Sequence, residues 1–154
     1  MERSERLQPL IRLAANREEQ AALALARARE NLANQEAKLE DLDSYRGEYR
    51  QVVSSAGGQG VSGRQVRGFH GFLGQLDQAV EGQLQVIERA RTEVEQRRQE
   101  WLAARVECQR MDLVIERFQD DEAWHEARRE QKVMDEFAGQ LALRNGRNDR
   151  NGTS

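Results

Sequence analysis

The chain has 154 residues, of which 33% are charged and only 5% aromatic, so it lacks the large apolar side chains of an ordinary globular core. Abundant Ala, Glu, Gln, Leu and Arg with a single proline is typical of long helices and coiled coils. The formal net charge of −3 gives no basic surface for nucleic acid, and the one cysteine, Cys108, excludes an intrachain disulfide.

The first expected element is a helix over about residues 8 to 53, because Pro9 is tolerated in a first helical turn. Apolar residues follow at alternating spacings of three and four, which predicts a narrow coiled-coil seam. Polar residues interrupt this seam at Glu18, Gln35 and Arg46. Its apolar members are Leu7, Ile11, Ala14, Ala21, Leu25, Ala28, Leu32, Leu39, Leu42, Tyr49 and Val53.

A glycine-rich bend is expected over residues 54 to 63, SSAGGQGVSG, because its glycines supply the backbone freedom that a chain reversal requires. Ser62 is in position to cap the next helix, with Gln65 three residues later as its capping-box partner.

A second helix is expected over about residues 63 to 143, followed by a disordered tail over residues 144 to 154. Its seam runs from Phe69 to Phe118, with interruptions at Gln83 and Arg97. The members between these ends are Leu73, Leu76, Val80, Ile87, Ala90, Val94, Trp101, Ala104, Cys108, Met111 and Ile115. Beyond Phe118 the seam positions become polar, so we expect the C-terminal part of this helix to be unpaired.

The sequence therefore predicts an all-α fold in which two long helices form an antiparallel coiled coil, a helical hairpin rod. We expect one coiled-coil domain over residues 1 to 154, with an unpaired C-terminal helical extension. A fold centred near residue 58 would place Leu25 near Ala90 and Leu7 near Cys108. No uncharged run approaches the roughly 20 apolar residues of a spanning helix, so no direct membrane insertion is expected.

Two motifs suggest chemistry, but their context argues against it. The glycines of residues 58 to 63 match a dinucleotide-binding pattern, which requires a preceding buried strand rather than a charged helix. Glu122 and His125 have the spacing of one half of a di-iron motif, without the second half. We therefore expect no enzyme, no metal and no cofactor. Trp124 lies beyond the seam and is a plausible partner contact.

The order of segments resembles the FliJ proteins of the bacterial flagellar type III export apparatus. The resemblance rests on RLQPLIRLA near the start, SYRGEYR before the bend, FHGFLGQLDQAV after it, a Trp at 101, and ERF leading to EARREQKVMDEFA. No single segment is diagnostic, and the specificity lies in their ordered combination over most of the chain.

The resemblance implies a non-enzymatic cytoplasmic component, peripherally associated with the inner-membrane export apparatus. It would promote assembly and activity of the export ATPase ring and link this ring to the membrane export gate. It would also interact with substrate-specific export chaperones. The basic residues that are candidates for contact with the ATPase are Arg128, Arg129 and Lys132. The implied contacts with the export gate fall on Leu42, Tyr45, Tyr49, Phe72, Leu76 and Ala79.

These gate candidates conflict in part with the seam, which already uses Leu42, Tyr49 and Leu76. One resolution is that the seam widens near the bend into a partly exposed apolar patch; the other is that the residues belong only to the core. Two alternative functions also stay open: a structural coiled coil that self-associates, and the equivalent stalk protein of a virulence type III secretion system.

Overall fold

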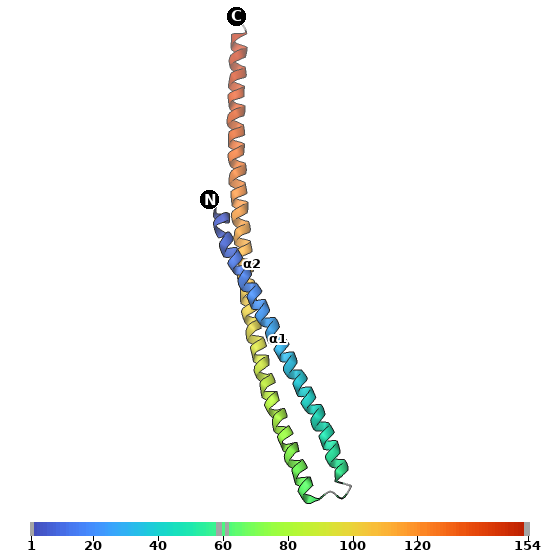
Figure 1. Ribbon diagram of the computed structural model, residues 1–154. Helices are drawn as coiled ribbons and strands as arrows, with labels where there is room; N and C mark the ends of the chain where they lie inside the picture. Colours follow the sequence, from blue (N-terminus) through green and yellow to red (C-terminus); the bar gives the residue numbers. More distant parts are fainter. Residues whose placement is uncertain (1, 58–59, 61, 153–154) are drawn as a thin grey trace. The chain divides into compact units, whose positions relative to one another are not determined.

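The computed structural model describes residues 2–57, 60 and 62–152, and two long helices account for nearly all of them (Figure 1). Helix α1 spans Arg3–Ala56 with 54 residues, and helix α2 spans Gly63–Asn151 with 89 residues. The described residues contain no strand. The predicted all-α helical hairpin is therefore confirmed. No described stretch of either helix is long and apolar enough to cross a membrane.

Helix α1 begins five residues before the predicted start, so Pro9 lies inside it rather than in its first turn. A proline here removes the hydrogen bond that an N–H at this position would give to the carbonyl of Glu5. The turn before Pro9 is nevertheless held, because the Arg6 amide donates to the Glu2 carbonyl at 3.1 Å and Ser4 bonds to α2.

Helix α2 continues to Asn151, so its predicted end near residue 143 and the disordered tail from 144 are not what the structure shows. The prediction used the loss of apolar periodicity as a sign of disorder. Periodicity reports whether a helix has a partner, whereas a segment without proline can stay helical with all its side chains in water. Residues 153 and 154 lie outside the described residues.

The chain divides into two units, which we describe separately. The hairpin unit is Asn16–Val106, and the terminal unit comprises Met1–Ala15 and Glu107–Ser154. That the whole chain acts as a single domain stays a prediction.

The hairpin unit buries a single line of apolar side chains between α1 and α2. Ile87 is the most enclosed at 2% exposure. The others are Leu25, Ala28, Leu76, Val80 and Ala90. Every one is a predicted seam residue, and the remaining seam positions of this unit are half-buried. A strip one residue wide is what two helices in mutual contact can enclose.

The bend is shorter than predicted, because α1 continues through Ser54 and Ser55 to Ala56. The Gly57 amide then donates to the Val53 carbonyl at 3.1 Å, and Gly60 has a φ of 75°, a conformation that favours glycine. Ser62 caps α2 as predicted, since its Oγ accepts the Gln65 amide at 3.4 Å. Gly58, Gln59 and Val61 of this segment lie outside the described residues.

The two helices pair farther along α2 than the predicted register. In the terminal unit Ser4 contacts Glu122, and in the hairpin unit Gln35 contacts Gln83. The connection between Ala56 and Gly63 is centred near residue 60 rather than 58, which moves partners by a few residues and accounts for the Gln35–Gln83 pair. The Ser4–Glu122 pair lies farther along α2 than this change alone would place it. Beyond Glu122, every residue of α2 is exposed. We call residues 123 to 151 the C-terminal extension.

Candidate functional site

Four aromatic residues form a cluster next to the bend, two from each helix. The Tyr49 ring lies edge-on to Phe72 with centroids 4.7 Å apart, and to Phe69 at 6.1 Å. Tyr45 meets Phe72 at 6.4 Å with ring planes at 89°. Such edge-to-face pairs are favourable beyond their buried area. We call Tyr45, Tyr49, Phe69 and Phe72 the aromatic cluster.

Ion pairs flank this cluster and tie the two helices together. Asp77 of α2 accepts from Arg46 at 3.1 Å and from Arg50 at 3.3 Å, both on α1. Arg46 also pairs with Asp43 at 2.6 Å within α1. These side chains are partly exposed, so each pair contributes little stability. By linking the two helices here, these ion pairs help to hold the two aromatic residues of α1 opposite the two of α2.

Burial separates the six gate candidates into two groups. Tyr45 and Phe72 are 50% and 37% exposed, and Ala79 is also exposed. Leu42 and Tyr49 are half-buried, and Leu76 is buried at 8% exposure. The seam does widen next to the bend, because Tyr45 and Phe72 lie outside it yet contact each other across the helices. Leu76 is a core residue of this chain, and its predicted contact with a gate stays untested.

Two of the polar seam interruptions face each other in the hairpin unit. Gln83 Nε2 donates to both the main-chain carbonyl and Oε1 of Gln35, each at 2.9 Å. Polar residues at single seam positions fix the register of coiled coils at a cost in stability. The interruptions at Gln35 and Gln83 are therefore matched across the two helices.

The three basic candidates for the ATPase end, Arg128, Arg129 and Lys132, are all exposed on the extension. The Arg128 guanidinium lies 5.2 Å from the centre of the Trp124 ring, which is itself 56% exposed. All three basic residues line one shallow hollow, which also includes Glu2, Glu122 and His125. This surface combines an exposed aromatic ring with three cations, a composition suited to a protein partner.

Glu122 caps the start of α1 in the terminal unit. Its two carboxylate oxygens accept the Ser4 amide at 3.0 Å and Ser4 Oγ at 2.6 Å. The Ser4 amide is one of the first N–H groups of α1, which have no partner within the helix. The hydrogen bonds from Ser4 lower the pKa of Glu122, whereas hydrogen bonding to Glu122 and its negative charge raise the pKa of Glu2.

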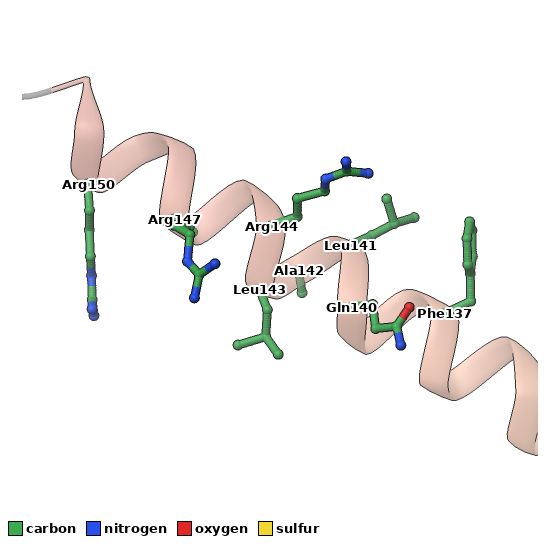
Figure 2. A pocket seen from close by; sticks show the side chains of 9 residues that line it. Phe137, Gln140, Leu141, Ala142, Leu143, Arg144, Arg147 and Arg150 are labelled. Atoms are coloured by element: carbon green, nitrogen blue, oxygen red, sulfur yellow. The ribbon is translucent and has the colours of Figure 1, made fainter.

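The last turns of α2 carry another hollow, lined from Phe137 to Arg150. Figure 2 shows that all its labelled side chains come from this one helix, with Phe137, Leu141 and Arg144 on one side and Leu143, Arg147 and Arg150 on the other. A single helix cannot enclose a small molecule, so this is an open surface rather than a binding pocket. Within the described residues, no three His, Cys, Asp or Glu side chains are grouped to hold a metal ion.

Sequence reasoning missed the ion pairs of Asp77 and the cap formed by Glu122. The Gln35–Gln83 pair could have been found, because each interrupts its own seam and the correct register places them opposite each other. Arg46 was also seen as an interruption, but its partner Asp77 lies beside the seam, where apolar periodicity gives no signal.

The comparison with curated protein sequences finds no match. Among solved structures, the chain is similar to a YscO homolog, CT670 from Chlamydia trachomatis, with 18% sequence identity and a TM-score of 0.49. The similarity covers 89% of this chain and 93% of that one. A family model described as the flagellar FliJ protein matches residues 3–147, which is nearly the whole chain. The chain therefore belongs to the FliJ family of flagellar proteins.

Proposed function

We propose that the protein is a non-enzymatic component of the flagellar type III export apparatus that binds the export ATPase through its terminal unit and the export gate through its hairpin unit. Membership of the FliJ family over residues 3–147 is the observation that carries this proposal. The structure adds two exposed surfaces of suitable chemistry, one in each unit. A cytoplasmic location at the inner membrane follows from these partners and is part of the proposal.

The gate contact is proposed for the exposed part of the aromatic cluster, Tyr45 and Phe72, together with Ala79. Large aromatic side chains are the usual anchors of protein interfaces. Phe72 is in contact with both Tyr49 and Tyr45, which holds its ring in place. The small side chain of Ala79 leaves room for a partner to approach the helix. Leu42 and Tyr49 contribute at the edge, while Leu76 supports the surface from the core.

The gate proposal is tested by replacing Tyr45 and Phe72 together with Ala and measuring binding to the purified cytoplasmic part of the gate protein. We expect binding to be lost while helicity is kept, because both side chains are partly exposed. Trp124→Ala removes an exposed aromatic residue from the terminal unit and is the matched control. A double variant that binds as well as the parent protein would refute this assignment.

The ATPase contact is proposed for Arg128, Arg129 and Lys132, with Trp124 as an aromatic anchor. These cations project from exposed turns of α2, where they can pair with acidic groups on a ring of subunits. No bond making is involved, so any effect on ATP hydrolysis would come from promoting ring assembly.

Sedimentation of the export ATPase with and without this protein tests the second contact. Reversing Arg128, Arg129 and Lys132 to Glu should abolish the shift of the ATPase toward its assembled ring. Reversing Arg64, Arg67 and Arg89 of the hairpin unit changes the net charge equally and should have no effect. Equal losses in both triple variants would mean that overall charge, rather than this surface, drives assembly.

Substrate-specific export chaperones complete the proposed set of partners, and no surface of the chain is assigned to them. Binding of purified chaperones to the two surface variants above is the direct test. Loss in only one variant would assign the chaperones to that unit.

A further inference from the structure

The C-terminal extension carries an apolar stripe that the seam does not explain. Val133, Met134, Phe137 and Leu141 recur at helical spacing, and they are 43–68% exposed. At about 100° per residue, Met134, Phe137 and Leu141 lie roughly 100° to 160° around the helix from Phe118, the last apolar seam residue. The stripe is therefore turned away from the seam, and a longer α1 would not cover it.

The charges on this face are arranged with opposite signs at the two ends of the stripe. Glu126 and Glu130 share a shallow hollow with Val133 and Met134, which one cation, Arg129, also lines. Arg144 projects on the same side as Phe137 and Leu141 (Figure 2). Along the chain, this face therefore carries acidic residues first, then the apolar stripe, and then a basic residue.

The net charges around Phe137 show the same polarity. The 17 residues before it, 120 to 136, contain seven acidic and three basic residues, a net charge of −4. The 17 residues after it, 138 to 154, contain three basic residues and one acidic residue, a net charge of +2. Phe137 is also the midpoint of the extension, which spans residues 123 to 151.

We propose that this stripe is a homodimer surface on which the extensions of two copies of the chain pair in antiparallel fashion about Phe137. A two-fold axis at this residue places Glu130 opposite Arg144 of the second copy and Val133 opposite its Leu141. Parallel pairing would instead oppose Glu130 to Glu130 and Arg144 to Arg144, which is repulsive. The acidic, apolar and basic order is complementary to itself only in the antiparallel direction.

The dimer goes beyond the proposed export function and does not depend on it. Four apolar side chains per copy form a small interface, so the dimer is concentration-dependent, with a dissociation constant on the order of 10 µM. Analytical ultracentrifugation of the full chain from about 1 to 300 µM should show reversible conversion from monomer to dimer. A chain that stays monomeric throughout this range would overturn the proposal.

Phe137→Glu places a charge at the centre of the stripe and should raise the dissociation constant at least about tenfold. Leu143→Glu is the matched control, because Leu143 is 77% exposed and projects on the opposite side of the helix. Both changes lie outside the paired part of the chain, so neither should alter its unfolding. Equal dissociation constants for the two variants would overturn the proposal.

The charges and the direction are tested separately. Glu130→Arg and Arg144→Glu should each weaken self-association about threefold to tenfold, and an equimolar mixture of the two variants should restore it. With Cys108 replaced by Ser, Ala138→Cys should disulfide-link two copies under oxidation, whereas Ala127→Cys should not. Parallel pairing would link both variants and would contradict the antiparallel arrangement.

Discussion

The aromatic cluster of the hairpin unit and the C-terminal extension of the terminal unit both expose large apolar side chains, but they are built differently. In the cluster, Phe72 of α2 is in contact with both Tyr45 and Tyr49 of α1, so two helices fix the surface. In the extension, the stripe around Phe137 belongs to one helix, and every residue from 123 to 151 is exposed. The side chains of the cluster therefore pack between two helices, whereas those of the stripe lie exposed on one helix.

The largest expected difference separates the core beneath the cluster from the extension. Ile87→Ala should lower the free energy of unfolding by about 2 to 4 kcal/mol, because it removes apolar volume that is 98% enclosed. Phe137→Ala, at a position 61% exposed, should change it by less than about 0.5 kcal/mol. Urea unfolding followed by circular dichroism at low protein concentration measures both values.

Similar losses for these two variants would show that the extension is packed against something in the folded chain. The stripe around Phe137 would then be part of the folded core rather than a surface available to a second copy.

The next largest effect lies inside the aromatic cluster. Tyr49→Ala removes two edge-to-face contacts from a half-buried ring and should cost about 1 to 2 kcal/mol. Tyr45→Ala removes one contact from a half-exposed ring and should cost less than about 1 kcal/mol. Thermal and urea unfolding of the two single variants measures both losses in the free energy of unfolding. Tyr45→Phe controls for loss of the hydroxyl alone. A cost for Tyr45 equal to that for Tyr49 would assign both residues to the core.

The sequence was sufficient to predict the seam of this fold. All of its apolar positions at alternating spacings of three and four are buried or half-buried in the structure. Such agreement is expected, because a two-helix contact is set by one local period. The helix ends were less predictable: α1 extends past Pro9 and α2 extends to Asn151, since neither end has a strong stop signal.

The register and the candidate surfaces depended on facts that periodicity does not carry. The bend lies about two residues later than expected, which is enough to explain why Gln35 pairs with Gln83 but not why Ser4 pairs with Glu122. Phe72 and Leu76 lie four residues apart, about 40° around the helix, so the spacing of apolar residues alone does not tell which of the two is exposed. The ion pairs of Asp77 lie beside the seam and could be found only from the folded arrangement.

Removing the extension is expected to have a smaller effect on stability. A chain that ends after Glu122 loses 29 of the 89 residues of α2, and its helical signal should fall in proportion. The free energy of unfolding should change by less than about 1 kcal/mol, because the removed residues are all exposed. The same truncation should abolish self-association. A chain that unfolds after truncation would show that the extension contributes to the paired part.

The smallest expected effect concerns the first turn of α1 and its dependence on pH. The hydrogen bonds from Ser4 lower the pKa of Glu122, so this contact stabilises the turn above the ordinary pKa of a glutamate and is lost as the pH falls through the lowered value. Glu2 acts in the opposite direction: its pKa is raised by the hydrogen bond to Glu122 and by the charge of Glu122, so its contribution is present at low pH and is lost as the pH rises through the raised value.

Amide protection factors of the first turn should therefore hold, or rise slightly, as acid first protonates Glu2, and should fall only once Glu122 is protonated. Ser4→Ala should lower the protection of this turn severalfold at neutral pH, because the hydroxyl donor is lost while the backbone bond remains. Val80, buried in the hairpin unit, is the internal reference and should keep its protection throughout. A first turn whose protection is already lost as Glu2 takes up its proton would mean that the carboxylate of Glu2, rather than that of Glu122, holds the start of α1. The start of α1 would then depend on Glu2, which directly precedes the helix, rather than on a contact with α2.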